Sequence, residues 1–218
     1  MATSPLDDIA LKDIPSILPM LSQGEQERLL AELDHLGELK KRDLLQERFI
    51  KFVEEVWPTF IAGRHHGRMA SAFERVAAGD CKRLIINMPP RHTKSEFASY
   101  LLPAWFLGKY PHKKVIQTSH TAELAVGFGR KVRNLVDKDI YTKIFPGLGL
   151  QSDSKAAGRW NTSKGGDYFA IGVGGAVTGK GATRWGHRHS NDAVVTAGFD
   201  CTSVEISGTK GWGRVGSH

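Results

Sequence analysis

A short apolar run passes into a loop that ends in Lys-Ser at Leu84-Ile85-Ile86-Asn87-Met88-Pro89-Pro90-Arg91-His92-Thr93-Lys94-Ser95. This order is typical of a phosphate-binding loop, in which backbone N–H groups and the N-terminus of the following helix face the phosphates. Lys94 supplies a positive charge, and the Ser95 hydroxyl is a suitable ligand for Mg²⁺. The strand and helix signals on either side favour a nucleoside triphosphate site over the alternative, an ordinary surface loop.

The loop departs from the usual G-x-x-x-x-G-K-[ST] pattern, because Met88 and Thr93 stand at its two glycine positions. If the position of Thr93 requires a positive φ, a β-branched residue there costs about 1–3 kcal/mol of strain. Either the loop adopts a conformation that threonine tolerates, or nucleotide binding is weakened. The sequence leaves both alternatives open.

The bulk properties predict one domain, or one domain with a small appendage, in a chain of 218 residues with 40% hydrophobic residues. Neither a run of about 20 apolar residues nor a signal-peptide pattern is present, so we expect a cytoplasmic protein without a membrane span. Cys81 and Cys201 lie far apart, which favours neither a disulfide framework nor a zinc site. The net charge of +7 suits a polyanionic partner, although it also serves solubility.

Helical signals dominate the N-terminal third of the chain. Residues 1–21 contain three prolines and are expected to be a loosely ordered leader. Ser22 and Glu25 predict a capping box, followed by an amphipathic helix or helix pair that extends to about Trp57. A further helix is predicted over 68–78, ending at Gly79.

Alternating strands and helices follow. The predicted order is strand 82–88, helix 95–108 with a kink or break at Pro103, strand 113–119 and helix 121–137. In the last helix, one apolar side is predicted for Leu124, Phe128, Val132 and Leu135, with Arg130 and Arg133 opposite. This order predicts parallel strands flanked by helices. A hairpin is then expected around Gly165-Gly166, leading into a glycine-rich segment over 172–181 that we interpret as a turn rather than a second phosphate loop.

Four ordered blocks carry a family resemblance. They are Met88–Ser95, Thr118-Ser119-His120-Thr121-Ala122-Glu123-Leu124-Ala125, Gly127-Phe128-Gly129-Arg130-Lys131-Val132-Arg133, and Gly172-Val173-Gly174-Gly175-Ala176-Val177-Thr178-Gly179-Lys180-Gly181-Ala182. The chain resembles, over about residues 45–182, the ATPase domain of the large terminase subunit of tailed bacteriophages. Four sequence blocks in the same order as in this family identify a resemblance far more specifically than one phosphate-binding loop does.

The resemblance implies an α/β fold of the P-loop NTPase class (ASCE type), with a parallel sheet flanked by helices and a helical N-terminal region. It implies an ATP- and Mg²⁺-dependent motor that packages double-stranded DNA in the cytoplasm of the infected bacterial host. Its partners would be the portal protein and the small terminase subunit, and the full-length protein would form a homo-oligomeric ring. We therefore expect a helical region at 1–60, a partial ATPase core at 61–182 and a divergent tail at 183–218.

The resemblance stops at Ala182. The family pattern continues with an apolar strand that ends in two adjacent acids, one for Mg²⁺ and one that polarises the attacking water. No adjacent acid pair occurs in residues 183–218, and Asp200, at the end of an apolar run, is a weak substitute. We expect this tail to be poorly ordered, as after a frameshift or junction, and hydrolysis to be impaired. The family pattern has a nuclease domain after the motor, and we do not expect one within residues 183–218.

Individual residues carry alternative interpretations. Pro89, Pro90, Arg91, His92, Thr93, Lys94 and Ser95 form the predicted nucleotide loop. Arg91 is expected at the γ-phosphate, as the family's loop arginine is, or else in solvent. Trp57 would stack on the adenine base or pack in the helical core. His65 and His66 are interpreted as surface or loop residues.

Arg130 and Arg133 are candidates for DNA contact or for action in trans on a neighbour's ATP, although a solvated helix face is the more ordinary role. Two further functions stay open: a helicase-like, nucleic-acid-stimulated ATPase fragment, and a non-catalytic DNA-binding remnant.

Overall fold

The computed structural model describes residues 17–89 and 91–172, and the backbone alone of 154–155, 184–188, 192–196, 203–206 and 216–217. Pro90, Asp200 and most of the expected leader lie outside these residues. The chain divides into two compact units between Asp43 and Leu44. No described helix combines the length and the apolar character needed to cross a membrane.

The first unit contains the 3₁₀ helix η1 (Leu18–Met20) and most of the long helix α2 (Gln23–Glu47). One half of the predicted capping box at Ser22 is present: the Glu25 carboxylate accepts hydrogen bonds from the Ser22 hydroxyl at 2.6 Å and from the Ser22 N–H at 2.9 Å, whereas Glu25 N–H donates to the Ser22 carbonyl. These two bonds lower the pKa of Glu25. The carboxylate thus satisfies a backbone donor at the start of the helix.

The predicted helix pair is confirmed, since α2 is followed by α3 (Phe49–Val56), and Trp57 and Pro58 come directly after α3. Arg48 between them has an extended backbone. Helix α4 (Arg64–Ala78) begins four residues earlier than predicted and ends, as predicted, at Gly79, whose φ of 94° suits glycine.

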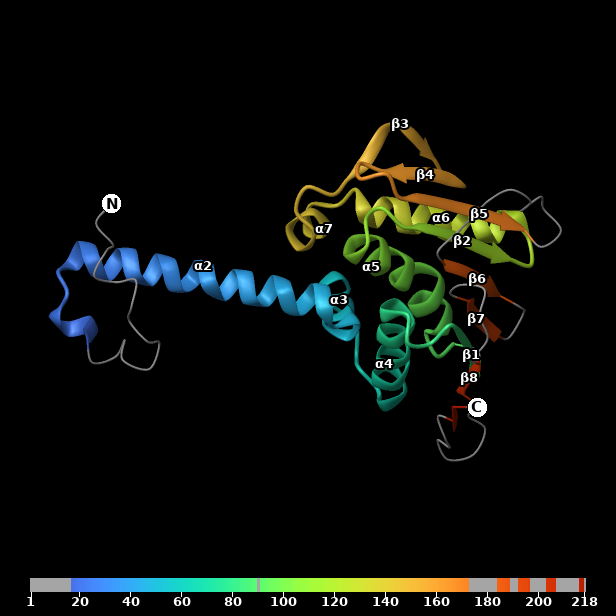
Figure 1. Ribbon diagram of the computed structural model, residues 1–218, viewed down its shortest axis with the longest axis horizontal. Coiled ribbons are helices and arrows are strands. Elements are labelled where there is room, and N and C mark those ends of the chain that lie inside the picture. Colours follow the sequence, from blue (N-terminus) through green and yellow to red (C-terminus); the bar gives the residue numbers. More distant parts are fainter. Residues whose placement is uncertain are drawn as a thin grey trace. The chain divides into compact units, whose positions relative to one another are not determined.

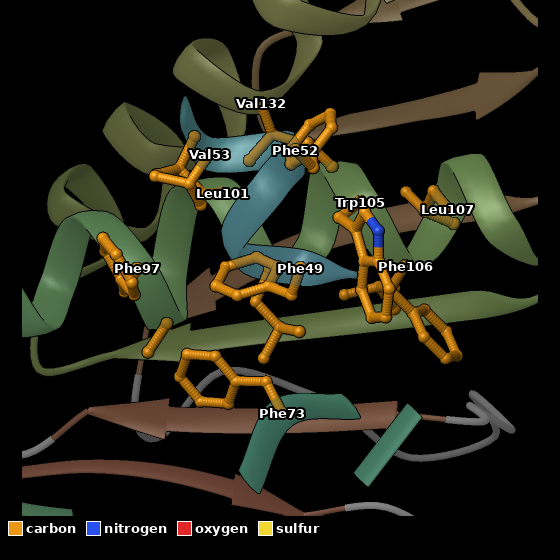
Figure 2. Close-up of a cluster of buried hydrophobic side chains, with 14 of the residues drawn as sticks. Phe49, Phe52, Val53, Phe73, Phe97, Leu101, Trp105, Phe106, Leu107 and Val132 are labelled. Atoms are coloured by element: carbon orange, nitrogen blue, oxygen red, sulfur yellow. The ribbon is translucent and has the colours of Figure 1, made fainter. Parts of the chain in front are cut away.

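An aromatic cluster lies within the hydrophobic core of the second unit (Figure 2). Phe49 of α3 lies edge-on to Phe73, Phe97 and Trp105, with ring centroids 5.3, 5.6 and 5.6 Å away. All four side chains are fully buried. These contacts join α3 and α4 to the helical segment that follows the predicted phosphate loop.

That segment begins at Lys94 and continues as the π-helix η2 (Glu96–Leu101) and the α-helix α5 (Leu102–Lys109). The kink predicted at Pro103 is present as this change of helix type. Proline has no N–H and would clash with the carbonyl four residues before it in a regular helix. The wider π turn just before Pro103 relieves this conflict, as the bond from Leu102 N–H to the Phe97 carbonyl indicates.

Among the described residues, nine strands form one sheet in the order β3-β4-β5-β2-β6-β7-β1-β8-β9. Their bounds are β1 Arg83–Asn87, β2 Lys114–Ser119, β3 Leu150–Ala156, β4 Arg159–Thr162, β5 Asp167–Gly172, β6 Arg184–Arg188, β7 Asp192–Thr196, β8 Ser203–Ile206 and β9 Gly216–Ser217. The fold is α/β, as predicted, but the sheet is mixed rather than parallel. Strand β5 pairs with β2 in parallel and with β4 in antiparallel orientation, because a short hairpin turn reverses the chain.

Helix α6 (Ala122–Val136) lies along β5 and β2, as Figure 1 shows, and α7 (Asp139–Ile144) follows it. Thr121 caps α6 by accepting a hydrogen bond from Leu124 N–H at 3.2 Å. The predicted apolar side is correct for Phe128, Val132 and Leu135, but Leu124 is 40% exposed. Leu124 lies in the first turn, which is exposed apart from Ala125.

The predicted hairpin is confirmed, with Trp160 of β4 opposite Tyr168 of β5. Gly165 in the turn has a φ of 84°. In the tail, β7 pairs with one edge of β1 in antiparallel orientation, and β8 pairs with the other edge of β1 in parallel orientation.

Candidate phosphate-binding site

Strand β1 ends at Asn87 and the helical segment begins at Lys94, so residues 88–93 form a strand-to-helix connection. Ser95 has a helical backbone. The first N–H groups of a helix lack partners within it and carry the positive end of its dipole. The local arrangement required of an anion-binding helix start is therefore present where the sequence predicts it.

The loop contains two residues with positive φ that are not glycine, Arg91 at 64° and Thr93 at 59°. Thr93 therefore adopts the left-handed conformation that the sequence left open, and the effect of its strain on nucleotide binding stays a prediction. Such residues cost of order 1–3 kcal/mol and persist where the surrounding structure holds them. Left-handed residues among right-handed ones also curve the backbone into concavities that bind anions.

The Lys94 side chain turns back towards the start of the loop, where Nζ donates to the Met88 carbonyl at 3.3 Å. Lys94 is buried and Ser95 is half-buried, whereas Pro89, Arg91 and His92 are exposed. The charge of Lys94 is therefore held against the loop, and the Arg91 guanidinium is accessible to a ligand from solvent.

His66 connects this loop to α4, a contact that the sequence did not predict. Its Nδ1 accepts a hydrogen bond from Gly63 N–H at 2.8 Å, so the proton of the neutral ring is on Nε2. Nε2 lies 2.6 Å from Thr93 Oγ1 and donates to it, and Thr93 Oγ1 donates to the His92 carbonyl at 2.6 Å. The three bonds form one chain with consistent donors and acceptors.

The interpretation of His66 as a surface or loop residue is wrong. The side chain is 5% exposed, on the first turn of α4, stacked on Phe97 at 4.9 Å and edge-on to Phe60 at 4.7 Å. Burial, together with the neighbouring His65 and His92, lowers its pKa to about 4. Because Thr93 and Phe97 belong to a segment far along the chain from His66, sequence spacing gave no signal for this environment.

Trp57 is half-buried at the end of α3 and packs against the hydrophobic core, as the second of its two predicted roles requires, while the adenine contact stays a prediction. Its Nε1–H donates to Thr59 Oγ1 at 3.0 Å, and its ring lies 5.4 Å from Phe60. Phe60 in turn contacts His66, so a row of rings connects Trp57 with the loop.

Arg130 is exposed, and the Arg133 guanidinium donates to Asn134 Oδ1 at 2.9 Å, which fits the solvated helix face that the sequence also allowed. Lys131 between them has a structural contact: its Nζ lies 2.7 Å from Glu96 Oε1 and over the Phe128 ring. This ion pair joins α6 to the helical segment directly after the loop.

Among the residues with described side chains, no group of three or more His, Cys, Asp or Glu could hold a metal ion. Mg²⁺ is usually bound by one or two protein oxygens together with substrate phosphates. Ser95 fits such a ligand, since it lies in the first turn after the loop. Asp200, the weak substitute for the missing acid pair, lies outside the described residues.

No family model matches the chain, and no similar curated protein or solved structure was found.

Proposed function

We propose that this chain binds a nucleoside triphosphate, as Mg-ATP, at residues 88–95, and that it is the ATP-binding motor portion of a phage large terminase. The observation that carries the proposal is the strained strand-to-helix loop, with left-handed Arg91 and Thr93 and with Lys94 folded over it. Strain of this kind is uncommon outside functional sites, where ligand binding repays it.

The residues of the loop take distinct roles. Helix-start N–H groups after Thr93 bind the β-phosphate, and Lys94 moves from the Met88 carbonyl to the phosphate oxygens. Ser95 ligates Mg²⁺, which would neutralise charge on the β- and γ-phosphates. Arg91, exposed at the loop, approaches the γ-phosphate.

Hydrolysis is expected to be slow. Phosphoryl transfer depends on positioned charges and on a residue that orients water, and the acid pair expected for these tasks is missing from the sequence after residue 182. Binding depends mainly on the loop, Lys94 and Mg²⁺, so it survives this loss. The packaging role, with double-stranded DNA, the portal protein and the small terminase subunit as partners, rests on the ordered sequence blocks.

The test is a titration of the protein with Mg-ATP by calorimetry, with Lys94→Ala as the variant. Loss of an ion contact to phosphate should weaken binding by at least about tenfold, or 1.4 kcal/mol. Lys109→Ala, at the end of α5, is the matched control, because it removes one lysine away from the loop. Equal and flat titrations for wild type and Lys94→Ala would remove the nucleotide proposal.

A DNA titration over a range of salt concentrations separates the motor from the DNA-binding remnant. The remnant would show salt-dependent DNA binding that Mg-ATP does not change. The motor would show a DNA affinity that depends on Mg-ATP and responds to Lys94→Ala.

A further inference from the structure

We propose that His66 is a positioning residue of the phosphate loop: its Nε2–H holds the Thr93 side chain and thereby keeps the Thr93 backbone left-handed at the start of the helix. The contact is short, 2.6 Å, and it joins α4 to a loop 27 residues away. For its consequence on ligand binding, the inference rests on the triphosphate site proposed above.

Thr93 needs an external partner because its conformation is unfavourable for a β-branched residue. Its bond to the His92 carbonyl is to a neighbouring residue of the same loop, so it does not anchor the loop to the rest of the protein. His66, in contrast, is fixed from three sides, by Gly63 N–H, by the Phe60 ring and by the Phe97 ring. The bond from His66 therefore ties the loop to the aromatic core.

The direction of the bonds makes this tie specific for one tautomer. Gly63 N–H occupies Nδ1, which leaves the proton on Nε2 to point at Thr93. The apolar rings around His66 disfavour a charged imidazolium, and so do the neighbouring His65 and His92. The ring centroids of His65 and His66 are 3.7 Å apart, and those of His65 and His92 are 6.0 Å apart. At neutral pH the ring is therefore held as a neutral donor.

The held conformation has a consequence for the helix start. The Thr93 carbonyl accepts a hydrogen bond from Phe97 N–H at 2.9 Å, the first bond of the helical segment. The orientation of Thr93 thus sets where the unpaired N–H groups of the first turn lie, and these are the donors that a phosphate requires. Releasing Thr93 should loosen this turn.

Two substitutions separate the two bonds of His66. In His66→Gln the side-chain amide reaches the position of Nε2 and retains a donor for Thr93. In His66→Asn the shorter amide retains an acceptor for Gly63 N–H and loses the donor. Thr93→Gly removes both the hydroxyl and the strain, so the loop no longer needs the bond. His112→Asn is the matched control, because His112 is exposed.

The first measurement is amide hydrogen exchange without nucleotide. Exchange of Phe97 N–H should be about tenfold faster in His66→Asn than in wild type, and close to wild type in His66→Gln and His112→Asn. In the Thr93→Gly background, His66→Asn should have no further effect. Thr93→Val removes the hydroxyl without touching His66, so it should also accelerate Phe97 exchange, and it provides the test if His66→Asn does not fold.

The second measurement is Mg-ATP affinity for the same variants. His66→Asn should bind about tenfold more weakly, or 1.4 kcal/mol, and His66→Gln within about threefold of wild type. Wild-type exchange rates in both His66→Asn and Thr93→Val would overturn the positioning role, as would an equal effect of His66→Asn in the wild-type and Thr93→Gly backgrounds. If exchange behaves as expected but Lys94→Ala binds Mg-ATP like wild type, the positioning role is upheld and the triphosphate site fails.

Discussion

The predicted phosphate loop and the hairpin turn between β4 and β5 solve the same backbone problem in different ways. The loop contains the left-handed residues Arg91 and Thr93, the hairpin contains the left-handed Gly165, and in each a threonine hydroxyl makes an anchoring hydrogen bond. In the hairpin, Gly165 takes the positive φ, and Thr162 Oγ1 accepts from Gly166 N–H at 2.8 Å and donates to the Pro111 carbonyl at 2.7 Å. In the phosphate loop, Thr93 takes the positive φ itself and needs His66.

The difference indicates what each turn is for. The hairpin has glycine at its left-handed position, and its own Thr162 hydroxyl bonds both to Gly166 N–H within the turn and to the Pro111 carbonyl outside it, as suits a structural turn. The loop at 88–93 holds strain at Thr93, which a side-chain bond from His66 of α4 stabilises. Strained backbone held from outside is typical of a ligand-binding segment, because ligand contacts can replace the external support.

The largest effect is expected for Gly166→Ala in the hairpin. A Cβ at this position would lie 2.4 Å from the Pro111 carbonyl oxygen and 2.9 Å from that of Lys113. These are backbone atoms that cannot rotate away, so the free energy of unfolding should fall by about 3 kcal/mol.

Chemical denaturation measures the fall in the free energy of unfolding of Gly166→Ala. Gly127→Ala in α6, where a Cβ meets nothing within 4 Å, is the control and should be neutral or stabilising by up to about 1 kcal/mol. Equal stabilities of the two variants would show that the hairpin is not closely packed.

A smaller and more diagnostic effect on the free energy of unfolding is expected when glycine is removed from the left-handed position of the hairpin and introduced at that of the loop. Gly165→Ala introduces strain in open space and should cost about 1–2 kcal/mol of unfolding free energy. Thr93→Gly should change it by less than about 1 kcal/mol, because relief of strain is opposed by loss of the hydrogen bond to His66. Thermal or chemical unfolding of both variants measures these changes. A fall of about 2 kcal/mol or more in the free energy of unfolding of Thr93→Gly would contradict a strained loop.

The third prediction concerns pH and distinguishes the loop from the hairpin, which has no such histidine among its described contacts. The pKa of His66 is about 4 in the folded chain, against about 6.5 for an unfolded histidine. Between these values the unfolded state binds a proton that folded His66 does not, so the His66 contribution to stability falls as pH decreases from about 6.5 to 4. Below about 4 this dependence ends.

Measuring the free energy of unfolding of wild type and His66→Gln across pH 4–7 isolates the contribution of His66 to stability, since the other eight histidines are common to both chains. The wild type should lose more stability than the variant over this range. Parallel stability curves would show that His66 titrates normally and is not enclosed as described.

Local features of the fold were predictable because the residues that cause them are close in sequence. Ser22 and Glu25 define the cap of α2, Gly79 ends α4, Pro103 marks the change of helix type, and Gly165-Gly166 mark the hairpin. Each depends on bonds or steric conflicts within a few residues.

Other elements were missed for identifiable reasons. Strand β3 contains polar residues without alternation, so its pairing with β4 is decided by the neighbouring strand rather than by its own pattern. Helix α7 spans six residues, too few for a periodic signal. The mixed order of the sheet, with β6 and β7 between β2 and β1, depends on pairings between residues far apart in the chain.

By itself, the sequence determined where the candidate site lies and which charges it carries, since the strand, loop, Lys94 and Ser95 follow one another within a single short stretch. The three-dimensional structure alone decided how the site is held. Whether Thr93 is left-handed, and that a buried neutral His66 supports it, depends on packing between α4, the loop and the aromatic core. Such packing follows from the free energy of the whole fold, which no local pattern of residues contains.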